Sequence, residues 1–501
     1  MRLVALGLLW VALSGFAAPP ARLVVAQTAE PASLDPLLLT GSPAEEIGSL
    51  VYSFLVRIDE RGRLVPDLAE RVPTIANGDI ARDGRTITYH LRHNVRWQDG
   101  APFSAADVVA TYRAVMDSRN SVPTRLGYDD VAAIDTPDAA TVRVHLRKAF
   151  APFLTYFFET ESYPVLPAHI LERTAGLTDS TLASAPVGTG PYRVERWNRG
   201  DDLTLDANAA YFGGAPKIAM LTIRFVPNPQ SIAAELQTGE IDATFDADPA
   251  LAGRLRANPR LRVQLVPIYG FTALTFQTRD PALRDPRVRA AVAQALSIER
   301  DVRRASFGTL TANDAAQGLF TWATIPTARP RSNAALPPRL TLAYDAGSAL
   351  DRRVAEQFQA DAQQAGLAIE LVPYARQFLL APAAQNGPIE SGHFQLALHA
   401  LLTGADPETS WLLASDQVPP AGFNVSRYGN ADVDRALADA LSTPDDARRK
   451  RDYAIVERAV ARDVPFVALW QTREIEALPA DLHGFRGSPE TPYFGVEGWS
   501  R

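Results

Sequence analysis

Side chains that could perform catalysis are few in this sequence and poorly arranged for it. The chain has seven histidines and no cysteine, which excludes disulfides, thiolate nucleophiles and Cys-based zinc sites. It contains no G-x-S-x-G, H-E-x-x-H or Walker A pattern. Adjacent acids such as Glu45-Glu46 and Asp129-Asp130 point apart and are typical of solvated surface. The sequence therefore predicts a protein that is not an enzyme.

The histidines are scattered rather than clustered. His90 and His145 fall on the polar faces of predicted strands, which indicates surface positions. His393 and His399 are six residues apart, a spacing that does not suit one face of a helix. No metal site and no cofactor is expected.

Length and charge limit the class of protein. A chain of 501 residues is too long for one hydrophobic core, so two or three domains are expected. The composition, 47% hydrophobic and 21% charged, is that of a globular protein. A formal net charge of −7 argues against nucleic-acid binding, which needs a basic surface.

The N-terminal segment has the form of a secretory signal peptide. Met1-Arg2 gives a basic start, Leu3 to Ala18 is apolar, and Gly15-Phe16-Ala17 is a small-x-small cleavage site. The apolar stretch is shorter than the ~20 residues that span a bilayer. We expect removal of residues 1–17 and a soluble, exported mature protein.

The elements that must position any site alternate between strands and helices. Residues 87–92, 142–147 and 221–225 alternate apolar and polar side chains, as half-buried strands do. Ser104 with Asp107 predicts a capped helix that continues to Met116, and Asp285-Pro286 predicts another helix start. A strand at 340–344, a helix at 350–362 and a strand at 367–371 form a βαβ unit with parallel strands.

Several short motifs occur in a fixed order along the chain. They are L-D-P at 34–36, V-Y-S-F-L-V at 51–56, L-V-P-D-L-A-E at 64–70, R-W-Q-D-G at 96–100, P-V-G-T-G-P-Y at 186–192, Q-T-G-E-I-D at 237–242 and R-V-R at 287–289. Taken together, they resemble the extracellular solute-binding proteins of family 5, the periplasmic receptors for dipeptides, oligopeptides and nickel complexes. The resemblance is weakest between Thr309 and Pro338.

The resemblance implies an α/β, two-lobed periplasmic binding protein of the class II type with an extra inserted domain. Domain I would comprise residues 18–49, 180–270 and 471–501, domain II residues 50–179, and domain III residues 271–470. The chain would cross the hinge near Tyr269 and again near Trp470. The ligand would lie in the cleft between domains I and III.

The resemblance also implies which residues meet the ligand. Peptide-binding members place an Asp after the position of His399 to pair with the ligand's α-ammonium, and two alignments put uncharged Thr403 or Gly404 there. Either the ligand lacks that amine, or Asp406 replaces the missing carboxylate. The expected ligand-binding residues are Thr40, Gly41, Ser42, Tyr269, His399, Thr403, Gly404, Asp406, Trp411 and Asn424.

The function implied is capture of a small ligand, with a peptide as the first expectation, and delivery to the permease of an ABC importer. The alternatives are a non-peptide solute such as a sugar, an opine or a metal chelate, and an exported hydrolase with an unusual active site. We expect a monomer in the periplasm whose lobes close around the ligand.

Overall fold

The computed structural model describes residues 21–38, 42–159, 163–174, 176–177, 180–245, 247–248, 251–310, 312, 321–325, 327–328 and 330–501. Of Ser42 and Pro43 only the backbone is described. The predicted signal peptide, together with Thr40 and Gly41, lies outside these residues.

The strands have the following bounds: β1 Arg22–Gln27, β2 Val56–Ile58, β3 Leu64–Pro66, β4 Thr86–His90, β5 Val131–Asp138, β6 Thr141–Leu146, β7 Tyr192–Asn198, β8 Asp202–Ala207, β9 Met220–Phe225, β10 Ala243–Thr244, β11 Leu261–Phe276, β12 Arg339–Asp345, β13 Ala368–Tyr374, β14 Leu396–Leu402 and β15 Phe466–Pro479.

The α-helices are α1 Ser42–Val51, α2 Ala105–Met116, α3 Ala168–Leu171, α4 Pro229–Thr238, α5 Ala252–Arg256, α6 Pro286–Gln294, α7 Ile298–Ala305, α9 Ala349–Gln364, α10 Arg376–Leu379, α11 Pro388–Ser391, α12 Ser410–Leu413, α13 Ala431–Leu441 and α14 Asp446–Asp463. Short 3₁₀ turns are η1 Ala151–Thr155, η3 Thr181–Ala183, η6 Thr321–Ala323, η7 Ala383–Gln385 and η8 Val496–Gly498. None of the described helices is long and apolar enough to cross a membrane.

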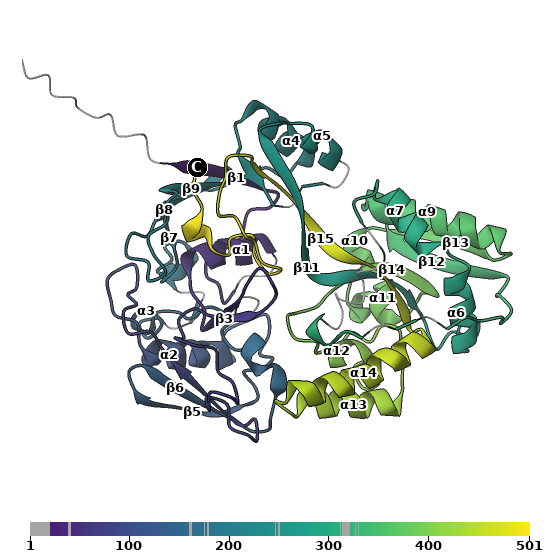
Figure 1. Ribbon diagram of the computed structural model, residues 1–501, viewed down its shortest axis with the longest axis horizontal. Coiled ribbons are helices and arrows are strands. Elements are labelled where there is room, and N and C mark those ends of the chain that lie inside the picture. Colours follow the sequence, from purple (N-terminus) through teal and green to yellow (C-terminus); the bar gives the residue numbers. More distant parts are fainter. Residues whose placement is uncertain are drawn as a thin grey trace, which may run out of the picture.

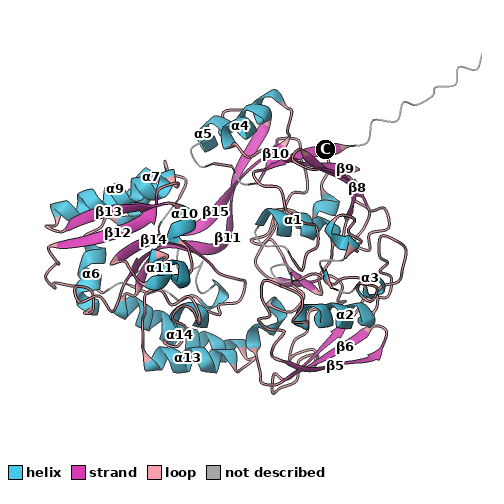
Figure 2. Ribbon diagram, turned by 180° about the vertical axis from the view of Figure 1, so that it is seen from behind, coloured by secondary structure: helices cyan, strands magenta, loops and turns pink. Residues whose placement is uncertain are grey.

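One twisted sheet runs through two lobes. Its strand order is β13-β12-β14-β11-β15-β10-β1-β9-β8-β7. The first lobe, at the left of Figure 1, carries β1 and β7–β9 with the segment from α1 to α3, and the second lobe carries β12–β14 with α6–α14. The long strands β11 and β15 join the lobes, and the same arrangement is visible from behind in Figure 2. The two-lobed α/β fold predicted from the sequence is therefore present.

The first lobe contains a separate three-stranded sheet, ordered β4-β6-β5, against which α2 packs. Helix α2 begins as predicted, because the Ser104 hydroxyl accepts from the Ala106 amide and the Asp107 carboxylate accepts from the Ser104 amide at 2.8 Å. Two backbone N–H groups at the start of α2, which have no partner within the helix, thus donate to side chains of the first turn.

The second lobe is built on the predicted βαβ unit. Strands β12 and β13 pair in parallel from Arg339–Ala368 to Asp345–Tyr374, and α9 connects them. The helix α6 begins at the predicted position, with Asp285 as its cap and Pro286 in the first turn. Parallel strands place their carboxyl ends at one edge of the sheet, and here that edge faces the connecting strands.

The connecting strands pair along most of their length but not evenly. Their antiparallel register shifts between Pro267 and Phe271 and again at Thr272. Tyr269 and Trp470, the positions expected at the crossings, lie within β11 and β15. Where the regular hydrogen bonding between two strands is interrupted, the strands bend more easily, so this segment is suited to act as a hinge.

The glycines of the P-V-G-T-G-P-Y motif have a packing reason. A Cβ on Gly188 would lie 1.8 Å from the Val51 carbonyl oxygen, and one on Gly190 would lie 2.5 Å from the Val51 carbonyl carbon. Both glycines therefore let the chain lie directly against the end of α1. The glycines of this motif therefore have a packing role.

Candidate ligand-binding site

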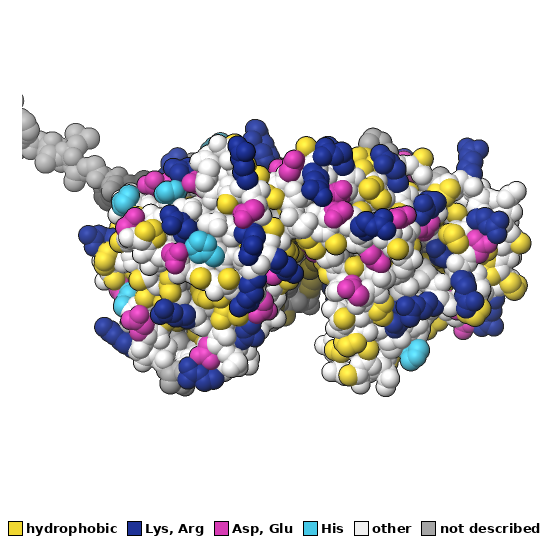
Figure 3. Space-filling model, turned by 90° about the horizontal axis from the view of Figure 1, so that it is seen from below, with side chains coloured by type: hydrophobic (Ala, Val, Ile, Leu, Met, Phe, Trp, Pro, Cys, Tyr) yellow, Lys and Arg dark blue, Asp and Glu magenta, His cyan; other side chains and the backbone are white. Residues whose placement is uncertain are grey.

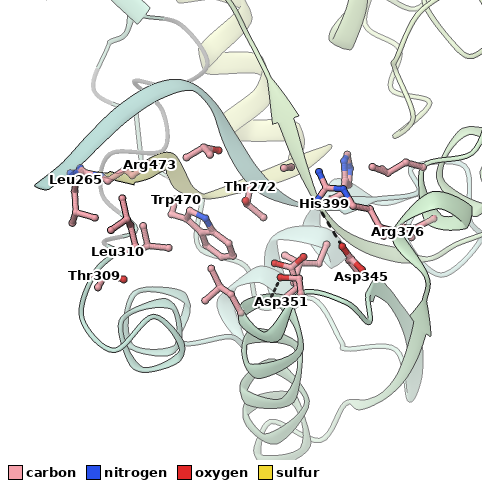
Figure 4. A pocket seen from close by; sticks show the side chains of 18 residues that line it. Leu265, Thr272, Thr309, Leu310, Asp345, Asp351, Arg376, His399, Trp470 and Arg473 are labelled. Carbon is pink, nitrogen blue, oxygen red and sulfur yellow. Dashed lines mark hydrogen bonds and ion pairs between the residues drawn. The ribbon is translucent and has the colours of Figure 1, made fainter. Parts of the chain in front are cut away.

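A cavity of ≈ 350 Å³ opens where the second lobe meets the connecting strands. We call it the hinge cavity, and the polar and aromatic side chains that define it are Asp345, Asp351, Arg376, His399, Trp470 and Arg473. Figure 4 shows that they converge from separate elements. Seen from below, the molecular surface is deeply notched between the two lobes (Figure 3).

The βαβ topology explains why these residues meet. Asp345 is the last residue of β12, and Arg376 is the first of α10, which follows β13. Ser348 caps α9, where its hydroxyl accepts from the Asp351 amide at 3.1 Å. Ligands of open α/β sheets bind outside the carboxyl ends of parallel strands, which is the position of this cavity.

Two carboxylates give the cavity its electrostatic character. Asp345 is only 6% exposed, and its Oδ2 lies 3.8 Å from Nη1 of Arg376. Asp351 forms no ion pair within the described chain. Burial raises the pKa of Asp351 to about 7, and the neighbouring charge of Asp345 acts in the same direction. Arg376 and Arg473 also line the cavity, so its two acids face two arginines, and Asp351 is the acid without an ion pair among the described residues.

The opposite wall of the cavity belongs to the connecting strands, and its apolar side chains lie beside Thr272, Thr472 and Arg473. Trp470 is buried in β15, and Leu265 and Ile475 come from the same two connecting strands. Any bending of β11 and β15 therefore moves one wall of the cavity relative to the Asp345–Asp351 side.

His399, one of the expected ligand-binding residues, lines the hinge cavity. It is 2% exposed, and its Nε2 lies 3.0 Å from the Thr275 hydroxyl. Burial lowers the pKa of His399 to about 4, so the imidazole is neutral at pH 7. It can offer a hydrogen bond but no positive charge.

One edge of β14 is open beside the cavity. Strand β12 pairs with β14 only at Leu342–Leu396 and Ala343–Ala397. From Leu398 to Leu402 that edge of β14 has no partner strand in the described chain, while β11 covers the other edge. Leu398, His399 and Ala400 line the hinge cavity. An extended chain segment could therefore pair with this edge.

A second cavity of ≈ 540 Å³ lies between the lobes, and we call it the outer cavity. The first lobe contributes Ile58, Gly62 and Thr74, and the second lobe contributes Trp322, Asp406 and Arg449, among other residues. The lobes also touch nearby, since a Cβ on Gly84 would lie 3.1 Å from Pro444.

Asp406 lines the outer cavity, but its charge is already balanced. Nη1 and Nη2 of Arg449 donate to its two carboxylate oxygens at 2.8 and 2.5 Å. The side chains of Arg449 and Asp406 are only 4% and 9% exposed. This pairing argues against Asp406 as the partner of a ligand ammonium, because giving up the pair would leave Arg449 buried without its counter-charge.

The other expected residues that the structure describes make structural contacts and do not line the hinge or outer cavity. The amide of Thr403 donates to the Tyr269 carbonyl at 3.3 Å, which ties the end of β14 to the hinge. Asn424 is fully buried, and its side-chain NH₂ donates to the carbonyls of Ala414 and Tyr428.

Trp411 packs on Phe423, with ring centres 6.2 Å apart, and Gly404 is half-buried. Tyr269, Thr403, Gly404, Trp411 and Asn424 line neither cavity. Thr40 and Gly41 fall outside the described residues, and Ser42 is described only as the first residue of α1.

Asp345, Asp351 and Arg376 were not among the residues predicted from the sequence. A usable signal was present, because Asp345 ends the first strand of the βαβ unit and Arg376 follows the second. The rule that such strand ends carry the site would have selected them. Trp470 was noted only as a crossing point.

Comparison with known proteins identifies the family of the chain. The family described as "Bacterial extracellular solute-binding proteins, family 5 Middle" matches residues 63–418. The chain belongs to this family. Its members are binding proteins rather than enzymes.

Individual relatives match over nearly the full chain. The glutathione-binding protein GsiB of Escherichia coli K12 is 27% identical over 506 residues, covering 98% of this chain and 97% of GsiB. The ABC transporter substrate-binding protein CtaP of Listeria monocytogenes has a TM-score of 0.83 at 22% identity, covering 96% of this chain and 99% of CtaP.

The oligopeptide-binding protein AppA of Bacillus subtilis, solved with a nonapeptide, has a TM-score of 0.74 at 20% identity, covering 96% of this chain and 99% of AppA. These structural matches show that the two-lobed fold is shared.

Proposed function

We propose that this protein captures a short peptide or peptide-like solute in the hinge cavity and delivers it to an ABC importer in the periplasmic space. The observation that carries the proposal is the open edge of β14 from Leu398 to Leu402, which borders the hinge cavity. A peptide backbone laid along this edge would gain main-chain hydrogen bonds, as in β-augmentation.

The charges of the cavity suit a ligand that carries an ammonium group. The usual amine-pairing position is uncharged here, since Thr403 or Gly404 occupies it. Asp345 and Asp351 line the same cavity as the open edge of β14, and Asp351 has no ion pair among the described residues. A free amine of the ligand would pair with Asp351 in a site where an unbalanced ion is costly.

Closure would follow from the position of the cavity. Its Asp345–Asp351 side belongs to the second lobe, and its Trp470 wall belongs to the connecting strands. A ligand that touches both stabilises one hinge angle over others, which is the only way in which it can drive closure. GsiB is named for glutathione binding, and AppA was solved with a nonapeptide. Both relatives are consistent with a ligand of this kind.

The test is calorimetry with a panel of short peptides in free, N-acetylated and C-amidated forms, accompanied by native mass spectrometry of the gently purified protein. Peptides with a free amine should bind, and N-acetylation should weaken them. Failure of every peptide, together with a non-peptide solute released from the purified protein, would contradict the proposal.

A further inference from the structure

A third cavity, of ≈ 180 Å³, lies within the first lobe and shares no lining residue with the hinge or outer cavity. We call it the arginine pocket, and its charged and aromatic lining includes Arg57, Asp67, Arg92, Arg486, Phe494 and Glu497. It is assembled from β2, the segments after β3 and β4, the β8–β9 loop and the C-terminal tail. Segments more than 400 residues apart thus meet in one small space.

Arg57 is the unusual member of this pocket. Its side chain is buried, with the residue only 7% exposed, and its Nε and Nη2 are buried without a hydrogen-bond partner among the described residues. No carboxylate of the described chain lies within ion-pair distance of it. A guanidinium stays protonated in proteins and has five donors, so leaving it unsatisfied in the interior is costly.

Two further guanidiniums face the same space. Arg57 and Arg486 both lie over the ring of Phe494, at 5.3 and 5.1 Å from its centre. Arg92 lies 5.5 Å from the ring centre of Phe212. Its Nε donates to the Asp67 carbonyl at 2.5 Å. The aromatic rings hold the three cations in place without neutralising them.

The carboxylates around these cations leave Arg57 without an ion pair among the described residues. Asp67 and Glu497 line the pocket, and Arg486 pairs with Glu60 at 4.0 Å. One oxygen of Asp67 accepts from the Phe54 amide at 2.8 Å, and burial raises the pKa of Asp67. What the pocket keeps is a set of unused N–H donors on Arg57.

We infer that the arginine pocket is a binding site for a small oxyanion of the carboxylate or phosphate type, held chiefly by the unused donors of Arg57. The planar guanidinium presents paired N–H groups that match two oxygens of such an anion. The anion would complete the hydrogen bonds of Arg57 and give its guanidinium a counter-charge. This site is separate from the hinge cavity, so it does not depend on the peptide proposal.

Calorimetry and thermal unfolding of the purified protein test this inference, with inorganic phosphate and acetate each compared with chloride at equal ionic strength. At least one of the two anions should bind saturably and raise the unfolding temperature. Phosphate binding alone indicates a free inorganic oxyanion, and acetate binding indicates a carboxylate group. Either result supports the site.

Variants locate the binding. Arg57→Met keeps the bulk of the side chain and should weaken the anion by about 10- to 150-fold, the loss expected for charge-assisted hydrogen bonds. Arg486→Gln, at a half-exposed residue, should weaken it as well and serves if Arg57→Met fails to fold. Arg448→Gln, on the exposed side of α14, should change nothing. Absence of saturable binding by both anions, or unchanged affinity in the Arg57 and Arg486 variants, would overturn the inference.

Discussion

Replacing Asp351 by Asn tests whether the acid pair of the hinge cavity receives the ligand's ammonium. The substitution keeps the shape of the side chain and removes its charge. Truncating one side of a buried charge pair costs about 2–5 kcal/mol. Because each 1.4 kcal/mol is a factor of ten, peptides with a free amine should bind about 30- to 5,000-fold more weakly. N-acetylated peptides should be nearly unaffected.

The same residue predicts how affinity depends on pH. The pKa of Asp351 is about 7 in the free protein, and an ammonium would bind the ionised form. Below pH 7 the carboxyl must lose a proton on binding, so affinity should fall about tenfold per unit as pH falls. Between pH 8 and pH 5 the loss would approach about 100-fold. The other charged groups facing the cavity are Asp345, Arg376 and Arg473, with neutral His399.

Calorimetry at several pH values, in buffers of different ionisation enthalpy, measures both the affinity and the protons released. Asp351→Asn should abolish the pH dependence, and Asp416→Asn, at an exposed acid outside both cavities, should leave it intact. Equal affinity at pH 5 and pH 8 for a free-amine peptide, with no proton release, would refute the reasoning.

Further outcomes follow from other described features. Glu476 is fully buried in β15, and burial raises its pKa to about 8, so wild-type stability should fall as pH rises from about 4.5 through 8. Glu476→Gln should therefore raise the free energy of unfolding at pH 8 by about 3–5 kcal/mol relative to wild type, seen as a higher unfolding temperature, and should have little effect at pH 5. An equal effect at both pH values would contradict this. Asp406→Asn should lower the free energy of unfolding by about 3–5 kcal/mol because it leaves Arg449 buried without a counter-charge. Asp432→Asn, in an exposed ion pair, should lower it by less than about 1 kcal/mol. Equal losses in denaturant titrations would argue against a stabilising role of the buried pair. Intact-mass measurement of a periplasmic extract should show a chain that begins near Ala18, and full-length protein confined to membranes would count against export. Small-angle scattering should show a smaller radius of gyration with peptide bound, and an unchanged radius at saturation would count against closure.

Local signals in the sequence predicted much of the fold. The capping box at Ser104, the Asp285-Pro286 start and the βαβ unit were all recoverable because each depends on residues close together in the chain. The site was harder to predict from the sequence, because Asp345, Arg376 and Trp470 come together only through tertiary packing. Arg449, the partner of Asp406, lies 43 residues later in α14. No helix or strand periodicity reveals a contact over that sequence separation.

The pairing of the first strand sets the order in which the first lobe can form. Strand β1 begins at Arg22, yet both of its neighbours, β9 and β10, lie about 200 residues later in the chain. Strand β10 in turn pairs with β15 at Ala477, close to the C-terminus. Contacts of such long sequence separation form slowly, because the intervening chain must first be brought together. A ribosome must therefore synthesise the chain as far as Thr244, roughly half of the polypeptide, before β1 has both neighbours, and almost all of it before β10 pairs with β15.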